Sequence, residues 1–417
     1  MAYRQRVVDR LLPGYLAAFG AVVLEGARAA GKTATALQHS RSSVRLDASP
    51  SLLEVADLSP ELILEGDVPR LVDEWQLAPS LWNVIRHEVD FRQAKGQFIL
   101  SGSATPEDDV TRHTGAGRFG RLRLRPMSLY EVGASSGAVS LAELVAGAGR
   151  VGAASGLSYR DMAVHAVRGG WPGLLGVPDD AAALANASYL DDLIRIELPT
   201  AADVRHDPIR VRRLVESLAR NVATEAKIVS LAADVNADGG DTHATTLRVY
   251  LDALERVFAV EPQPAWNVAL RSRSRLRTTA KVHFVDPSLA CAALRVGADR
   301  LARDVDYFGC VFESMVVRDL RVYASLDRGE VFHYRDNTGL EVDVVIEFPG
   351  GGWGAVEVKL GEQRLADAEA SLLKLARERV DTALVGEPAF LAVVTAGQFA
   401  RTLPSGVHVI PLATLGP

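Results

Sequence analysis

The stretch Gly26-Ala27-Arg28-Ala29-Ala30-Gly31-Lys32-Thr33 decides the fold of the first part of the chain. It fits the pattern G-x-x-x-x-G-K-[ST] of a phosphate-binding loop. The apolar run Val22-Val23-Leu24 before it predicts a buried strand, and residues 34–38 after it predict the start of a helix. The glycines permit a tight turn whose N–H groups face phosphate oxygens at a helix N-terminus. The motif predicts that residues 26–33 bind ATP, with Lys32 on its phosphates and the Thr33 hydroxyl on Mg²⁺; a chance glycine-rich turn is the alternative.

An acidic pair ends the next informative strand, Arg70-Leu71-Val72-Asp73-Glu74. ATP hydrolysis needs two carboxylates at such a strand end. Asp73 is expected to bind Mg²⁺ and Glu74 to polarise the attacking water as general base. An acidic turn after a core strand is the alternative interpretation. Because a phosphate-binding loop lies upstream, the pair favours ATP hydrolysis over nucleotide binding alone.

Two further catalytic candidates follow this pair. Ser101, near the end of the predicted strand 97–103, is the better-placed residue to orient the water, and Ser103 is the second candidate. Arg118 lies in a glycine-rich loop and is expected to neutralise charge on the γ-phosphate, in its own subunit or in that of a neighbour. An ordinary solvated arginine is the alternative there.

The alternation of strand and helix patterns predicts the fold class of this part. Predicted strands near 21–26, 43–48, 70–74, 97–102 and 120–125 alternate with helical patterns near 32–40, 50–57 and 79–94. Such alternation is typical of an α/β fold, a parallel sheet with helices on both faces. Ligands bind at the carboxyl ends of such strands, where the candidate residues fall.

The composition indicates a folded protein of several domains. The chain has 417 residues, of which 48% are hydrophobic and 24% charged, with a net charge of −6. No global basic field favours nucleic acid, so such binding needs a local basic patch. Two cysteines, Cys291 and Cys310, predict a reducing, cytoplasmic compartment. No apolar run approaches the length of a membrane span, and no signal peptide or membrane partner is expected.

The order of these motifs resembles prokaryotic AAA+-type P-loop ATPases that carry a C-terminal region of unknown function. The matching segments are residues 26–33, 71–76, 100–103, 116–118, 129–131, 169–173 and 189–198. The resemblance covers nearly the whole chain. It implies an AAA+-type ATPase domain at 1–133, and a homo-oligomer with ATP at subunit interfaces is a further expectation.

The middle of the chain predicts two different regions. Residues 134–160 are rich in Gly, Ala and Ser and suggest a loose connection, and 161–220 suggest helices; together, 134–220 are expected to form a linker and helical lid. Residues 221–297 predict a winged-helix-like domain, with helices before an extended hairpin. An alternating row, Arg271, Arg273, Arg275 and Arg277, puts four arginines on one face and predicts contact with nucleic acid. A solvated hairpin edge and a protein-interaction module are the alternatives.

Residues 298–417 contain a second chemical pattern. Asp343 on one predicted strand is followed, after thirteen residues, by Glu357-Val358-Lys359 on the next. This spacing is that of the PD-(D/E)xK nuclease fold: the two carboxylates are expected to bind Mg²⁺, Lys359 to stabilise charge, and Glu313 from a helix to complete the metal site. The resemblance also implies this fold here. Loss of catalysis, with the domain kept as a binding module, is the alternative.

These observations lead to two main hypotheses and a weaker third. The first is an ATP-hydrolysing protein that acts on nucleic acid, as an ATP-gated nuclease or a toxin or defence component. The second is a regulatory switch ATPase whose nuclease-like domain only binds DNA or protein. A small-molecule kinase is disfavoured by the Asp73-Glu74 pair and by the large C-terminal half.

Overall fold

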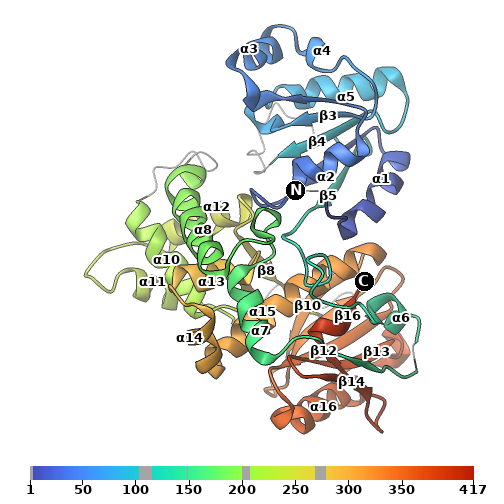
Figure 1. The fold of residues 1–417 in the computed structure, drawn as a ribbon, viewed down its shortest axis with the longest axis vertical. Helices are drawn as coiled ribbons and strands as arrows, with labels where there is room; N and C mark the ends of the chain where they lie inside the picture. The colour runs from blue at the N-terminus through green and yellow to red at the C-terminus, as the bar shows by residue number, and fades with distance from the viewer. Residues whose placement is uncertain (1–2, 103–114, 148, 200–206, 268–278) are drawn as a thin grey trace.

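The computed structural model describes residues 3–102, 115–147, 149–199, 207–267 and 279–417. In Figure 1 an N-terminal sheet with its helices lies at the top, a helical part lies at the left, and a second sheet lies at the lower right. Both ends of the chain, marked N and C, lie on the side where the two sheets approach each other. The helical part contacts the first part through the ion pair of Arg28 with Glu197 and shares an apolar core with the second sheet.

The N-terminal sheet is parallel, with strand order β2-β3-β4-β1-β5. Its strands are β1 (Ala21–Glu25), β2 (Ser42–Arg45), β3 (Arg70–Asp73), β4 (Phe98–Gly102) and β5 (Phe119–Arg123). The five strands and their parallel pairing confirm the expectation from sequence. Because all carboxyl ends share one edge, the loop after β1 and the end of β3 lie on either side of the end of β4.

Helices cover both faces of this sheet, as predicted. They are α1 (Leu12–Ala18), α2 (Lys32–His39), α3 (Pro50–Leu58), α4 (Pro60–Ile63) and α5 (Leu81–Arg92). Successive side chains of a strand point to opposite faces. Val22 accordingly packs in one core with Leu12 and Ala36, while Val23 packs in the other with Trp82.

The Gly/Ala/Ser-rich segment is not the loose connection that we expected. Its short strand β6 (Val139–Ser140) pairs with β16 (Leu415–Gly416), and β7 (Ala153–Ala154) pairs with β14 (Phe399–Thr402). A short helix, α6 (Leu141–Val145), lies between them. Backbone pairing of this kind does not depend on side-chain type, so composition alone gave no sign of it.

The helical part begins with α7 (Tyr159–Arg168), α8 (Asp179–Asp192) and the π-helical turn η5 (Leu193–Glu197). It continues with α10 (Pro208–Arg220), α11 (Ile228–Val235), α12 (Ala244–Arg256), α13 (Pro287–Ala293) and α14 (Ala298–Arg303). Between α12 and α13, β8 (Val260–Gln263) and β9 (Lys281–Phe284) pair antiparallel. Thr224, between α10 and α11, adds a bridge to Val282 of β9.

The second sheet is mixed and has strand order β10-β11-β12-β13-β15-β14-β7. Its further strands are β10 (Glu330–Arg335), β11 (Glu341–Glu347), β12 (Trp353–Lys359), β13 (Phe390–Thr395) and β15 (His408–Pro411). β10, β11 and β12 are antiparallel neighbours, and β13 runs parallel to β12. The parallel pairing of β12 and β13 requires a crossover connection, which the helix α16 (Leu365–Lys374) provides.

Two helices sandwich this sheet. The long helix α15 (Val305–Ala324) packs on one face, where Val344 and Val356 join its core, and α16 packs on the other with Val345 and Ala355. The core beneath α15 is continuous with that of the helical part. The helical part and the second sheet therefore share one apolar core.

No helix among the described residues is long and apolar enough to cross a membrane.

Candidate active site

The loop between β1 and α2 has the backbone that its glycines make available. Gly26 has φ +153° and Gly31 has φ +99°, in the region that residues with a Cβ rarely adopt. A Cβ at Gly26 would lie 2.0 Å from the Leu124 carbonyl oxygen. The loop therefore needs glycine at Gly26 for conformation and for space.

Lys32 is buried beneath this loop. Its Nζ donates to the carbonyl oxygens of Gly26 and Ala27, at 2.9 Å each. Burial lowers the pKa of Lys32 to about 8, although Glu74 and Asp73 act in the opposite direction. The ammonium group thus lies inside the loop and is held by backbone carbonyl oxygens, which a phosphate can replace as partners.

Asp73 lies at the carboxyl end of β3, next to the end of the central strand β4. The Thr33 hydroxyl is 3.0 Å from both of its carboxylate oxygens, and the Ser101 hydroxyl donates to it from β4. Arg45, at the end of β2, places its Nε 3.7 Å from Asp73 Oδ2. The structure brings Thr33, Asp73 and Ser101 together as the sequence predicts, and it adds Arg45, which the sequence gave no reason to select.

Glu74 follows Asp73 in a left-handed conformation, with φ +56°. Its carboxylate accepts a hydrogen bond from the Gln76 side-chain amide. A non-glycine residue in this region is uncommon and is found most often at turns and functional sites. The left-handed conformation turns the chain out of the buried strand at Glu74. The Glu74 side chain is half-buried at the same sheet edge as Asp73.

Arg118 does not join this site within its own chain. Its carbonyl oxygen accepts the N–H of Ala21, the first residue of β1, whereas the phosphate-binding loop follows the last. Five strand residues span about 15 Å. Its guanidinium contacts Asp90 of α5, with Nε 3.0 Å from Oδ1. Arg118 therefore lies about one strand length from the phosphate-binding loop of its own chain, and we do not expect it to act in the same subunit. A role in a neighbouring subunit stays a prediction.

Arg6 holds the loop from below, and the sequence gave no sign of it. It is buried, and its guanidinium donates to the Ala30 and Arg125 carbonyl oxygens at 2.8 Å and to Glu131 at 3.1 Å. Glu131 also accepts the N–H groups of Val7 and Ser128. These contacts tie the phosphate-binding loop to the segment after β5.

The helical part supplies a second set of contacts to the loop. Arg28 forms an ion pair with Glu197 of η5, at 3.2 Å, and Pro172 packs close to Gly31. Trp171, the neighbour of Pro172, lies with its ring centroid 4.9 Å from that of Tyr189 on α8. The segment 169–173 was singled out in sequence only through a resemblance, and here it contacts the loop.

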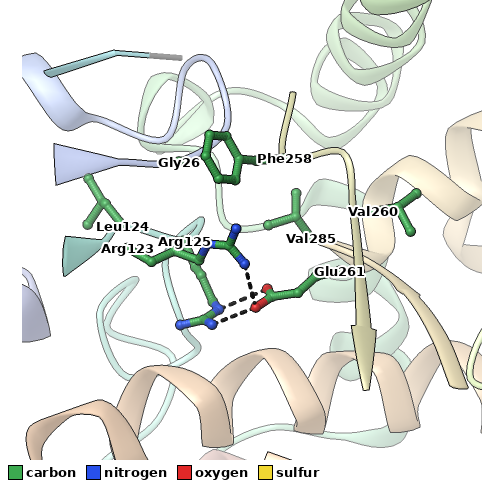
Figure 2. Close-up of a pocket in the computed structure, with 8 residues that line it drawn as sticks. All are labelled: Gly26, Arg123, Leu124, Arg125, Phe258, Val260, Glu261 and Val285. Carbon is green, nitrogen blue, oxygen red and sulfur yellow. Dashed lines mark hydrogen bonds and ion pairs between the residues drawn. The ribbon is translucent and has the colours of Figure 1, made fainter. Parts of the chain in front are cut away.

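A buried carboxylate joins the three parts of the molecule near Gly26. Glu261 of β8 accepts hydrogen bonds from Arg125 at 2.6 and 2.9 Å and from Arg123 at 3.0 Å, as Figure 2 shows. Arg321 of α15 lies 3.4 Å from it. Burial opposes its ionisation, but Arg125 and Arg321 outweigh burial and hold the pKa of Glu261 well below its usual value.

The C-terminal candidates also meet in space. Lys359 Nζ lies 3.2 Å from Asp343 and 2.5 Å from Glu357. Lys281 of β9 joins them, with Nζ 2.6 Å from Glu313 and 3.5 Å from Asp343. The sequence identified the three carboxylates and Lys359 but missed Lys281, because it lies on the other side of the domain boundary that we predicted.

Charge and burial oppose each other in this cluster. Burial raises the pKa of Glu313 to about 8, and burial together with Asp343 raises the pKa of Glu357 to about 8. Burial also opposes ionisation of Asp343, but Lys281 and Lys359 hold its pKa below the usual value. Among the residues that the structure describes, no three His, Cys, Asp or Glu side chains are arranged to hold a metal ion.

The two clusters therefore differ in what they fit. At the first site, Thr33 and Asp73 offer the hard oxygen donors that Mg²⁺ prefers, beside a glycine loop and a lysine suited to phosphates. At the second, the ammonium groups of two lysines already contact the carboxylates.

Ser103 and the row Arg271, Arg273, Arg275 and Arg277 lie outside the described residues.

Comparison with known families agrees with the geometry of the first site. Residues 18–133 match a family described as an AAA domain. Residues 159–300 and 308–415 match two domains of unknown function, DUF8612 and DUF4143. The AAA match contains the glycine loop, Asp73 and Ser101, so this part of the chain is similar to P-loop ATPases.

Similar proteins include the uncharacterized proteins Mb2031c of Mycobacterium bovis and Rv2008c of Mycobacterium tuberculosis. Each is 26% identical over 343 residues, which is 80% of this chain and 69% of the relative. Among solved structures, the Walker-type ATPase PABY2304 of Pyrococcus abyssi aligns with a TM-score of 0.40 and 13% identity, over 69% of this chain and 94% of that one. A TM-score this low does not establish a shared fold.

Proposed function

We propose that the chain binds ATP with Mg²⁺ at the loop of residues 26–33 and hydrolyses it. The observation that carries this proposal is the meeting of Thr33 and Asp73, 3.0 Å apart, beside the buried Lys32 at the carboxyl edge of a parallel sheet. Ligands of such sheets bind at this edge. The AAA match over the same residues supports it.

In this proposal each residue at the edge has one task. The N–H groups of the loop and the N-terminus of α2 bind phosphate oxygens, and Lys32 turns from the Gly26 and Ala27 carbonyls to the β- and γ-phosphates. Thr33 and Asp73 hold Mg²⁺, which when bound neutralises phosphate charge. Glu74 takes the proton of the attacking water, and Ser101 fixes the Asp73 carboxylate.

Arg118 fits this proposal only across a subunit interface. Its side chain is about half exposed and lies at the sheet edge away from its own loop. A neighbouring copy of the chain presents Arg118 to this chain's γ-phosphate in the proposed homo-oligomer. ATP then lies at subunit interfaces, as the resemblance to AAA+-type proteins implies.

Two variants test the ATPase proposal. We expect Lys32→Ala to lower ATP turnover by at least about 10²-fold, because it removes a cation that stabilises developing charge. Glu74→Gln is expected to lower turnover as strongly while ATP stays bound, since only the base is lost. Lys95→Ala removes an exposed lysine of the same part and serves as control. Wild-type turnover in both site variants would contradict the proposal.

The parts beyond residue 220 support a role in nucleic-acid processing as the finer proposal. For residues 221–297, a winged helix is supported by α11 and α12 followed by the antiparallel pair β8 and β9, with the bridge from Thr224. For residues 298–417, a PD-(D/E)xK fold is supported by the order α15, β10, β11, β12, α16, β13 and by the meeting of Asp343, Glu357 and Lys359. The arginine row 271–277 remains the proposed contact for nucleic acid.

The alternative is a switch ATPase whose C-terminal part binds a partner without cleavage. The ammonium groups of Lys281 and Lys359 on all three carboxylates favour this alternative in the conformation described. Incubation of plasmid and RNA with Mg²⁺ and ATP separates the two. Cleavage by wild type and none by Lys359→Ala supports the nuclease; binding without cleavage supports the switch.

A further inference from the structure

Five charged side chains from three regions of the chain meet beside β11 and β12 of the second sheet. They are Glu313 of α15, Asp343 of β11, Glu357 and Lys359 of β12, and Lys281 of β9. Three carboxylates thus face two ammonium groups, and all five residues are mostly buried. Burying such charges costs less when each is paired with an opposite charge, and removing one partner leaves another buried and unpaired.

The lysines take the oxygen atoms that a metal would need. Lys281 contacts Glu313 Oε1 and Asp343 Oδ1, while Lys359 and the Val358 N–H both donate to Asp343 Oδ2. A divalent cation requires several such oxygens at about 2.0–2.6 Å. Both Asp343 oxygens already have donors, so the cluster does not fit a metal ion as it stands.

Lys281 differs from Lys359 in where it comes from. Lys359 is two residues from Glu357 on the same strand, so it belongs to the carboxylate cluster itself. Lys281 begins β9, whose partner β8 carries Glu261. In register, Lys281 lies opposite Gln263, and Gln263 donates to the carbonyl oxygens of Phe332 and Asp343. The β8–β9 pair therefore packs against the second sheet, and this contact places Lys281 of β9 beside the carboxylates.

We propose that Lys281 is a built-in cation that closes the C-terminal carboxylate cluster to divalent metal, and that a metal ion binds there only when Lys281 is removed or withdrawn. Lys281 contacts Glu313 and balances the charge of Asp343, so it lies where a bound cation would otherwise satisfy them. The proposal depends neither on ATP hydrolysis nor on nucleic-acid cleavage, because it concerns only which cation satisfies these carboxylates.

The other end of the β8–β9 pair indicates how Lys281 is held in place. Glu261, two residues before Gln263, is bound by Arg123 and Arg125 from the segment beside the phosphate-binding loop. Arg125 also offers its carbonyl oxygen to Arg6, which in turn contacts Ala30 of the loop. The same short strand pair thus contacts the first sheet through Glu261 and the carboxylate cluster through Lys281.

Mn²⁺ binding to the full-length, nucleotide-free chain tests this proposal, with free Mn²⁺ measured by electron paramagnetic resonance. We expect wild type and Lys227→Met, which changes an exposed lysine, to bind the same amount. Lys281→Met is expected to bind one additional Mn²⁺ per chain. Adding Asp343→Asn to Lys281→Met should remove that additional ion.

Two results would overturn the proposal. One is a folded Lys281→Met variant that binds no more Mn²⁺ than wild type. The other is a wild-type chain that already binds an ion which Asp343→Asn alone removes. If Lys281→Met does not fold, Lys281→Gln, which keeps a hydrogen-bond donor without the charge, is measured under the same two criteria. The melting temperature gives a second readout: Mn²⁺ should raise it in the Lys281 variants and leave it unchanged in wild type.

Discussion

The edge of the first sheet and the face of the second both bring acidic and lysine side chains together, and they differ in how the carboxylates are satisfied. At the first, hydroxyl groups of Thr33 and Ser101 contact Asp73, and Lys32 faces backbone carbonyls. At the second, Lys281 and Lys359 contact the carboxylates directly. The closest donors to Asp73 are neutral hydroxyl groups, and the Arg45 guanidinium lies farther away, at 3.7 Å. Such a site can accept a cation with phosphates, whereas at the second site ammonium groups already take the place of a cation.

The largest expected effect is the loss of ATP turnover when a carboxylate is removed from the first site, compared with its removal from the second. Asp73→Asn should lower ATP turnover by on the order of 10²-fold or more, because it removes the carboxylate proposed to hold Mg²⁺. Asp343→Asn should leave turnover within about twofold, since it lies in the other cluster. Phosphate release under saturating ATP measures both. An equal loss of ATP turnover in the two variants would contradict the claim that only the first cluster takes part in hydrolysis.

Glu261 links the two regions, and its removal should cost stability. Glu261→Gln leaves three buried or partly buried arginines without their carboxylate, which should lower the free energy of unfolding by about 3–5 kcal/mol. Glu54→Gln, a change at an exposed residue of α3 away from this cluster, should alter it by less than about 0.5 kcal/mol. Urea unfolding followed by tryptophan fluorescence measures the difference. Similar unfolding curves for the two variants would remove Glu261 as a structural link.

The same residue predicts a pH dependence. The pKa of Glu261 is lower in the folded chain than in the unfolded one, where it is about 4.3. Its stabilising effect is therefore fully present above about pH 4.3 and is lost as the pH falls through the lower, folded value. The stability gap between wild type and Glu261→Gln should narrow only in that acidic range. A gap that narrowed between pH 6 and 8 would point to another titrating group.

A mixing experiment gives the smallest effect and sharpens the position of Arg118. Arg118→Ala and Lys32→Ala subunits are each expected to be inactive alone. Random mixing should restore about a quarter of wild-type sites, those with Lys32 from one subunit and Arg118 from the next. Turnover of the mixture measures this. No recovery in a mixed oligomer would leave Arg118 as a surface residue paired with Asp90.

The parts that the sequence predicted well are those in which neighbouring residues act together. The phosphate-binding loop is contiguous, and strand alternation placed Asp73 and Ser101 at the edge next to it. Glu357 and Lys359 share a strand, so their common face followed from a period of two. The five parallel strands, the helices on both faces and the C-terminal strands were predictable for the same reason.

The parts that the sequence did not reveal depend on contacts between distant segments. Arg6 and Glu131 lie far apart in sequence, and Lys281 meets Glu313 and Asp343 only through the docked β8–β9 pair. The sequence did not show at which end of β1 Arg118 lies, because a loop next to a strand can lie at either end of it. The Gly/Ala/Ser-rich segment gave no sign of its pairing with β14 and β16, since backbone hydrogen bonds do not require particular side chains.

The most direct test of the central claim is calorimetric titration of a non-hydrolysable ATP analogue with Mg²⁺ into wild type and Lys32→Ala. We predict one molecule bound per wild-type chain, and affinity lowered by at least about tenfold in Lys32→Ala, because the lysine's charge-assisted contact with phosphate is lost. Equal affinity in the two chains, or no binding by wild type, would contradict the assignment of residues 26–33 as the nucleotide site.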